Sequence, residues 1–196
     1  MSDRLSDYRA KRRAGATPEP GVADAGGPRS GTGAPRFVIQ KHDASSLHYD
    51  FRLEVDGTLR SWAVPKGPST DPRVKRLAVQ VEDHPLDYGD FEGVIGQGNY
   101  GSGAVIVWDA GTYRNLDEQH SIAEALDAGH AKFWLEGKKL AGGWTLQRTR
   151  GGAKPQWLLI KRRDQGADAR RNPQSTQPES VKSGRTIEQV AQDGPQ

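Results

Sequence analysis

The chain has 196 residues, of which 34% are hydrophobic and 27% are charged, and its formal net charge at pH 7 is +3. It contains no cysteine, which excludes disulfides, thiolate metal sites and cysteine nucleophiles. No apolar run approaches the roughly 20 residues of a membrane-spanning helix, and no signal-peptide core is present, so we expect a cytoplasmic protein without membrane association.

Residues 1–34 are predicted to form a flexible N-terminal arm. A short basic stretch from Leu5 to Arg13 has helical potential, and a run rich in glycine, alanine and proline follows it. The arm has too little apolar surface to offset the entropy of ordering, so we expect it to be mostly disordered without a ligand. The part that can dock on the folded domain or on a substrate is Thr17-Pro18-Glu19-Pro20.

The folded domain is predicted over residues 35–164, where short apolar segments alternate with glycine, proline and aspartate. Asp56-Gly57 separates two of these segments and favours a tight hairpin. A helix is predicted at Ser121–Ala128, because Ser121 and Glu124 form a capping box and Gly129 can end the helix. Many short strands with little helix indicate an all-β sandwich or closed barrel. The predicted strands are Arg36–His42, Leu47–Val55, Leu59–Val64, Arg76–Glu82, Ala104–Asp109, Gly111–Arg114, Ala131–Leu135, Trp144–Arg150 and Trp157–Arg162.

The C-terminal residues 165–196 are polar again, and we predict a linker or disordered tail there. The stretch from Pro178 to Arg185 has the composition of a linker, and a short amphipathic piece, Ile187–Ala191, follows it. A linker in this place favours a module excised from a longer chain over a stand-alone protein.

The segment Leu47–Val55 alternates polar and apolar side chains. Because a β-strand sends successive side chains to opposite faces, His48, Asp50 and Arg52 share one face. The other face carries an apolar stripe, which we expect to be buried in the core: Leu47, Tyr49, Phe51, Leu53 and Val55.

His42 precedes this segment by a turn-forming stretch, residues 43–46. If the two flanking strands fold back on each other, His42 comes close to His48 and Asp50. Two imidazoles and one carboxylate can hold Mn²⁺, Zn²⁺ or Fe²⁺ and leave positions open for water or substrate. A solvated polar face of an antiparallel sheet explains the same residues about equally well.

Two further residues lie where functional sites often form. His84 lies at the end of a predicted strand, on the same polar face as Arg76. It is either a site residue or a turn residue before Pro85. Lys66 lies on a rigid loop between two prolines and can meet a phosphate as a point charge, although a solvated loop lysine is the commoner case.

The residues alone leave three classes of function open. One is a metal-dependent enzyme that acts on phosphate esters. A second is a non-haem Fe(II) oxygenase, with a facial triad drawn from His48, Asp50 and His130. A third is a non-catalytic module that binds DNA ends through a basic surface, which the mild positive charge permits but does not require.

Several long motifs, in order over about residues 35–164, then point to one family. They are Gln40-Lys41-His42, Leu47-His48-Tyr49-Asp50-Phe51-Arg52-Leu53-Glu54, Ser61-Trp62-Ala63-Val64-Pro65-Lys66-Gly67-Pro68, Val81-Glu82-Asp83-His84-Pro85-Leu86-Asp87-Tyr88, Phe91-Glu92-Gly93 and Trp157-Leu158-Leu159-Ile160-Lys161-Arg162. Together they resemble the 3′-phosphoesterase domain of bacterial ATP-dependent DNA ligase D. The flanking segments Thr17–Pro20 and Ser183-Gly184-Arg185 are also similar to the flanks of that domain.

The resemblance implies a barrel of about eight strands with one or two short helices and a crescent-shaped active site. It implies Mn²⁺ as the cofactor, with Zn²⁺, Co²⁺ or another divalent cation as substitutes, and it implies three metal ligands: His42, His48 and Asp50. It also implies catalytic and phosphate contacts from Arg52, His84 and Tyr88, with Lys66 and Arg76 as supporting phosphate-binding residues. The family's N-terminal functional residues would fall on Glu19 and Arg13.

The function that the resemblance implies is trimming of DNA 3′ ends during non-homologous end joining. A phosphodiesterase step would remove a terminal ribonucleoside and leave a 3′-phosphate, and a phosphomonoesterase step would then expose a 3′-hydroxyl. The implied partners are DNA primer-template ends, ligase and polymerase domains of the same polypeptide, and Ku. We expect a monomer in the bacterial cytoplasm, associated with the nucleoid. The role of His84, as general acid or as stabiliser of the transition state, stays open.

Overall fold

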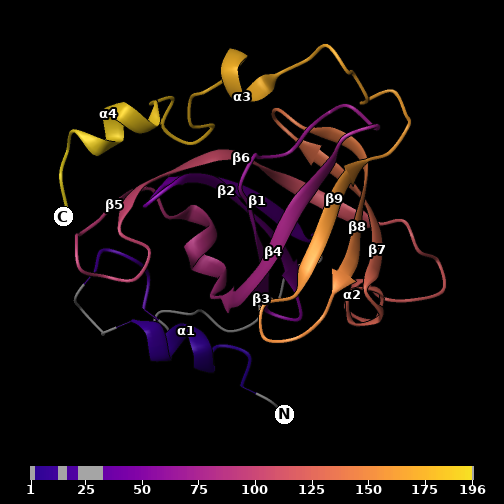
Figure 1. The fold of residues 1–196 in the computed structure, drawn as a ribbon, viewed down its shortest axis with the longest axis horizontal. Coiled ribbons are helices and arrows are strands. Elements are labelled where there is room, and N and C mark those ends of the chain that lie inside the picture. The colour runs from indigo at the N-terminus through magenta and orange to yellow at the C-terminus, as the bar shows by residue number, and fades with distance from the viewer. Residues whose placement is uncertain (1–2, 13–16, 22–32, 196) are drawn as a thin grey trace.

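The computed structural model describes residues 3–12, 17–21 and 33–195, and within these ranges the strands form one antiparallel sheet that closes into a barrel (Figure 1). The strand order is β1-β2-β3-β4-β9-β8-β7-β6-β5, and an additional pairing of β1 with β6 closes the ring. The strands are β1 (Arg36–Asp43), β2 (Leu47–Val55), β3 (Thr58–Val64), β4 (Lys75–His84), β5 (Gly93–Ile95), β6 (Gly103–Asn115), β7 (His130–Gly137), β8 (Ala141–Arg150) and β9 (Gln156–Lys161). The helices are short: α1 (Ser6–Lys11), η2 (Leu86–Asp90), α2 (Ile122–Ala128), α3 (Pro173–Thr176) and α4 (Ile187–Ala191).

The predicted all-β barrel is therefore confirmed. Among the described strands, β5 pairs with β6 alone, and the other strands form the ring. The predicted hairpin turn is also present, with Asp56 at φ 49° and Gly57 at φ 79°, the left-handed geometry that a two-residue hairpin requires. The predicted α2 has the capping box of Ser121 and Glu124 and ends at Gly129.

The sequence predicted two separate strands, Ala104–Asp109 and Gly111–Arg114. This prediction is wrong, because both segments belong to a single long strand, β6. A Cβ at Gly111 would lie 2.0 Å from the carbonyl oxygen of Glu136 on β7. The glycine therefore permits close approach of two backbones, which is a second reason for glycine inside a strand besides interruption.

The interior of the barrel is filled by aromatic and aliphatic side chains from all around the ring. Phe51 stacks on Phe133 with ring centroids 5.7 Å apart, and Trp62 meets Trp157 edge-on at 5.7 Å. The predicted stripe of β2 is buried here, except that Leu47 at the open end of the strand is 46% exposed. Since this stripe faces inward, the polar residues of β2 must face outward.

A second apolar layer covers the outer face of β1, β3 and β6. Tyr8 from α1, Tyr88 from η2 and Phe91 pack against strand residues that include Val38 and Val107. This layer buries polar side chains that would otherwise be open to solvent, so it creates a buried polar region outside the barrel.

Described parts of the N-terminal and C-terminal segments contact the barrel. Residues 3–12 and 17–21 pack against the barrel, while residues 1–2, 13–16 and 22–32 of the predicted arm lie outside the described residues. Residues 165–195 follow the barrel surface on the side away from α1 (Figure 1). Ile187 and Val190 are buried against Ala104 and Ile106 of β6. No described helix is both long and apolar enough to cross a membrane.

The polar C-terminal segment exchanges hydrogen bonds with the barrel. The indole nitrogen of Trp108 and the ammonium group of Lys139 donate to the carbonyl of Gln177 at 2.9 and 2.8 Å. The hydroxyl of Ser180 donates to Glu92 at 2.7 Å. Composition alone does not reveal such contacts, because they depend on backbone carbonyls.

Candidate active site

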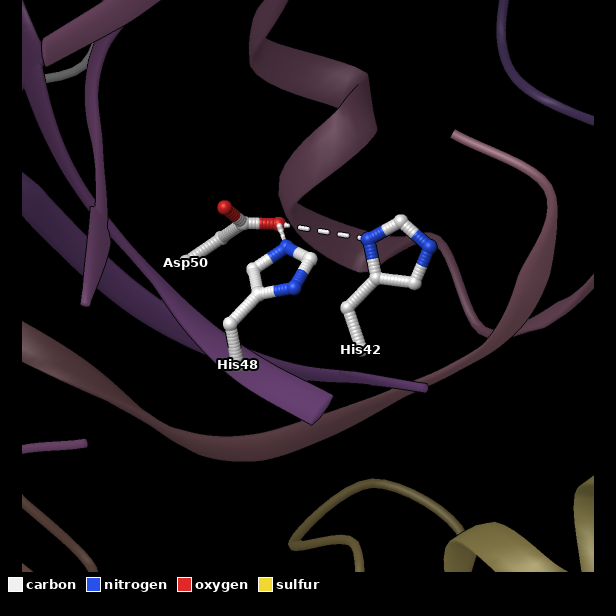
Figure 2. Close-up of side chains that lie close together, drawn as sticks. All are labelled: His42, His48 and Asp50. Atoms are coloured by element: carbon white, nitrogen blue, oxygen red, sulfur yellow. Dashed lines mark ion pairs between the residues drawn. The ribbon is translucent and has the colours of Figure 1, made fainter. Parts of the chain in front are cut away.

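The three predicted metal ligands lie together on the outer face of β1 and β2. The register of these strands places His42 opposite His48, and Asp50 follows two residues later on the same face. Their ligand atoms all lie within 4.8 Å of one another. Nδ1 of His42 and Nε2 of His48 are each 3.6 Å from Oδ2 of Asp50. Figure 2 shows both imidazole rings beside this carboxylate. The turn between the strands thus brings together three residues that the sequence separates.

The far nitrogen of each imidazole is held by a backbone carbonyl. Nε2 of His42 donates to the oxygen of Gly101 at 2.8 Å, and Nδ1 of His48 donates to the oxygen of Ser46 at 3.0 Å. A carbonyl oxygen only accepts hydrogen bonds, so these nitrogens carry the hydrogens. In a neutral imidazole the nitrogens that face Asp50 then present lone pairs, which is the arrangement of metal-binding histidines.

Asp50 is a buried carboxylate surrounded by cationic and hydrogen-bonding groups. Burial alone would raise its pKa, but the Arg52 guanidinium, 3.3 Å from Oδ2, and the two imidazoles hold the pKa well below its usual value. Burial would likewise lower the pKa of His48, but the neighbouring Asp50 raises it. The carboxylate therefore stays ionised and attracts any cation that enters the site.

Arg52 is 2% exposed and has partners at three of its nitrogens. Nε donates to Oε1 of Gln40 at 2.8 Å, Nη1 donates to Oγ of Ser61 at 2.8 Å, and Nη2 faces Asp50. A guanidinium has five N–H groups, so donors are left for a ligand. Gln40 in turn donates to the carbonyls of Tyr88 and Phe91 at 2.8 and 3.0 Å. This network fixes the orientation of the guanidinium.

His84 and Tyr88 form the opposite side of the site, with ring centroids 4.6 Å apart. Nδ1 of His84 donates to the carbonyl of Glu82 at 2.9 Å, and Nη2 of Arg12 approaches Nε2 at 3.4 Å. Burial and the nearby Arg52 and Arg12 guanidinium groups hold the pKa of His84 well below its usual value. The ring is therefore neutral, with its Nε2 lone pair toward Arg12.

The N-terminal arm supplies Arg12, which the sequence analysis missed. Its Nε donates to Glu19 at 3.0 Å, its Nη1 donates to Glu82 at 3.3 Å, and its guanidinium carbon lies 3.9 Å from the ring centroid of Tyr8. The predicted Glu19 is buried here and accepts a hydrogen bond from the Tyr88 hydroxyl at 2.9 Å. Burial and this carboxylate raise the pKa of Tyr88 well above its usual value. Arg13, the other predicted arm residue, lies outside the described residues.

These groups line one open pocket. It is bounded by residues of β1, β2 and β4, by η2, by the arm and by the loop before β6: Arg12, His42, His48, Asp50, Arg52, Glu82, His84, Tyr88 and Tyr100 among others. Lys66 and Arg76 are not among the described residues that line it. Lys66 is exposed on its loop, where Gln174 donates to its carbonyl at 3.0 Å. These two cations therefore do not contribute to the lining of this pocket.

His130, the third ligand of the oxygenase alternative, is not part of the cluster of His42, His48 and Asp50. It is exposed at the start of β7 and lines a different pocket with Asp117 and Lys132. The facial triad of His48, Asp50 and His130 is therefore not assembled, whereas His42 completes a three-residue cluster with the first two.

The fold and the site define a class: a closed β-barrel with a candidate metal centre and two guanidinium groups on its outer face. The sequence model of the DNA Ligase D 3′-phosphoesterase domain matches residues 40–148. The chain therefore belongs to the DNA ligase D 3′-phosphoesterase domain family, as the sequence motifs predicted.

Relatives of known name support this assignment. The multifunctional non-homologous end joining protein LigD of Pseudomonas aeruginosa is 54% identical over 187 residues, which is 93% of this chain and 22% of that protein. The multifunctional non-homologous end joining DNA repair protein LigD of Mycobacterium tuberculosis H37Rv is 44% identical over 168 residues, or 84% of this chain and 20% of that protein. The LigD protein of Mycolicibacterium smegmatis is 41% identical over 170 residues, or 84% of this chain and 21% of that protein. The chain thus spans about a fifth of the length of these relatives.

Proposed function

We propose that this chain is a divalent-cation-dependent phosphoesterase that processes DNA 3′ ends. The observation that supports it most strongly is the convergence of two imidazole nitrogens and one carboxylate beside a buried guanidinium. Both nitrogens are 3.6 Å from Asp50 Oδ2, and Arg52 Nη2 is 3.3 Å from the same atom. A cation and a guanidinium side by side suit a phosphate group, whose oxygens can meet both.

The residues that would hold the cation are His42, His48 and Asp50. Nitrogen and carboxylate ligands with open positions suit Mn²⁺, and Zn²⁺ or Co²⁺ can replace it. When bound, the cation would supply Lewis-acid polarisation of a phosphate oxygen. The backbone carbonyls of Gly101 and Ser46 fix both imidazoles for this task.

Arg52 and Arg12 would bind the phosphate and offset the charge that develops during hydrolysis. Arg52 uses the donors that Gln40, Ser61 and Asp50 leave free. Arg12 approaches from the arm, so it would complete the site from the side opposite β2. Lys66 and Arg76 lie outside the pocket lining and would contribute positive potential rather than direct contacts.

His84 and Tyr88 would position these groups. The neutral His84 ring has no hydrogen to donate at Nε2 while it faces Arg12 at 3.4 Å, so its role as a general acid is disfavoured in the unliganded protein. It would instead aim the Arg12 guanidinium into the pocket. Tyr88 keeps its proton, and its hydroxyl donates a hydrogen bond to Glu19. The centroid of its ring lies 4.9 Å from the guanidinium carbon of Arg52.

The substrates we propose are primer-template ends that carry a 3′-ribonucleoside or a 3′-phosphate. Water would displace the terminal ribonucleoside and leave a 3′-phosphate, and a second hydrolysis would release inorganic phosphate and leave a 3′-hydroxyl. The names of the relatives place them in non-homologous end joining, and we extend that process to this chain. Its partners would then be ligase and polymerase domains of one polypeptide and Ku, in the bacterial cytoplasm.

One experiment tests the proposal against both alternatives. The protein is incubated with labelled primer-templates that end in a 3′-ribonucleoside or a 3′-phosphate, with Mn²⁺ or with a chelator. We expect Mn²⁺-dependent shortening of the first and loss of phosphate from the second. DNA binding with no product in either condition would support a non-catalytic module. Consumption of both co-substrates in a parallel incubation with Fe²⁺, 2-oxoglutarate and oxygen would support the oxygenase.

A further inference from the structure

An aromatic side chain with no assigned role stands at the mouth of the candidate active site. Tyr100 is 49% exposed and lines the same pocket as the metal cluster and Arg52. Large exposed apolar side chains are otherwise few among the described residues: Leu47 and Leu77. A half-open aromatic ring beside a catalytic pocket is a candidate contact for a flat part of the substrate.

The loop that carries Tyr100 is tied to the metal cluster. The next residue, Gly101, accepts the hydrogen bond from His42 at 2.8 Å, so the loop backbone is held against a predicted metal ligand. Gly98 and Gly101 adopt φ values of 83° and 74°, and the amides of Asn99 and Ser102 donate to carbonyls within the loop. The ring is therefore presented at a fixed place next to the cluster.

Two cations of the N-terminal arm surround the ring. The ammonium of Lys11 lies 4.8 Å from the ring centroid and 3.4 Å from the hydroxyl, while it also pairs with Glu82 at 3.0 Å. The guanidinium carbon of Arg12 lies 5.6 Å from the centroid. The pocket mouth thus combines positive charge with an open aromatic surface, and a nucleotide combines an anionic phosphate with a flat base.

We propose that Tyr100 is a stacking platform for a nucleobase that adjoins the phosphate in the pocket. This inference rests on the proposed function and specifies how the site recognises a nucleic-acid end rather than phosphate alone. Stacking tolerates every base, because each one has a π face, so Tyr100 would select for the presence of a base rather than for its identity.

The test measures DNA binding in the presence of a chelator, so that it does not depend on hydrolysis. The probes are primer-templates ending in a 3′-ribonucleoside, with a normal base, an abasic sugar or 2-aminopurine at the terminal or the preceding position. Replacement of a stacking aromatic by alanine typically costs roughly 5- to 150-fold in affinity. We expect Tyr100→Ala to lose affinity in this range for base-bearing ends and to lose the 2-aminopurine fluorescence change at one of the two positions.

Two matched variants separate stacking from a structural role. Tyr100→Phe keeps the ring and should bind as the wild type does. Leu77→Ala removes another exposed apolar side chain, 42% exposed and outside the pocket lining, and should have no effect. On an end that is abasic at the stacked position, the wild type and Tyr100→Ala should bind equally.

The inference is overturned if Tyr100→Ala binds base-bearing ends like the wild type, or if it weakens base-bearing and abasic ends by the same factor. The second result would mean that the residue only shapes the loop. The proposed function is judged separately, by Mn²⁺-dependent release of phosphate from a primer-template that ends in a 3′-phosphate. Its failure would leave the binding result intact.

Discussion

Arg12 Nη2 lies 3.4 Å from Nε2 of His84, and this contact joins the N-terminal arm to the barrel. Because an arginine can only donate, the approach requires a lone pair on His84. The same guanidinium reaches two buried carboxylates, those of Glu19 and Glu82. The arm is therefore part of the candidate site and not an appendage to it.

We expect Arg12→Lys to lower kcat/KM for a 3′-phosphate end by about 100-fold or more, the usual loss when one charge-stabilising donor is removed. A lysine ammonium lacks the planar fork that meets three partners at once. Arg9→Lys, at an exposed arm residue paired with Asp3, is the control and should keep full activity. Wild-type kcat/KM in Arg12→Lys would show that the arm does not take part in the reaction.

The neutral His84 predicts an acid-side loss of stability. Its folded pKa lies well below its usual value, which is about 6.5 in an unfolded chain. Between these two values the unfolded state binds more protons, so stability is complete above about pH 6.5 and is lost as the pH falls toward the folded pKa. We expect urea unfolding in a chelator to show this loss in the wild type and a smaller loss in His84→Gln.

The contribution of His48 to stability has the opposite pH dependence. Its pKa is raised, so it contributes stability below about pH 6.5 that is lost as the pH rises through its folded pKa. The stability contributed by His84 is thus lost below about pH 6.5, and the stability contributed by His48 is lost above it. An identical acid-side slope in the wild type and His84→Gln would contradict the neutral assignment.

Lys66 and Arg76 should act on DNA through charge alone, since neither lines the pocket. Lys66→Ala and Arg76→Ala should weaken binding and reduce the slope of log affinity against log salt by about 0.9 for each phosphate interaction lost. Lys132→Ala, at an exposed lysine of a different pocket, is the control. An unchanged salt slope in the first two variants would rule out this role.

The C-terminal segment should stabilise the fold. Ile187→Ala removes a buried side chain from the contact of α4 with β6 and should lower the free energy of unfolding by about 2 kcal/mol or more. Glu188→Ala changes an exposed neighbour on the same helix and should have little effect. Equal free energies of unfolding for Ile187→Ala and the wild type would mean that the segment does not contribute to stability.

The parity of β2 allowed its inner stripe and its outer polar face to be predicted, because strand geometry sets both. The same reasoning reached His42, since the turn at 43–46 leaves little freedom in the register. Gln40 carried an equal signal, two residues before His42 on the same face, and was not assigned. On β4 the polar parity of Arg76 and His84 is misleading, because Ala78 has the same parity and is fully buried, while its neighbour Leu77 is 42% exposed.

The arm and the tail could not be predicted in the same way. Arg12 and Glu19 reach the site through tertiary contacts with Glu82 and Tyr88, and no local periodicity encodes such contacts. The contacts of residues 165–195 with the barrel depend on backbone carbonyl acceptors such as that of Gln177, and every sequence supplies such acceptors. Low apolar content indicates that a segment cannot fold alone, but it does not exclude docking on a neighbour.

The central claim, a catalytic cation held by His42, His48 and Asp50, is tested most directly by measuring Mn²⁺ affinity and Mn²⁺-dependent 3′-end hydrolysis together. Alanine variants of these three residues should lose tight Mn²⁺ binding and both hydrolytic steps, while His130→Ala, at an exposed histidine outside the cluster, should keep them. Wild-type binding and activity in any one of the three alanine variants would contradict the account.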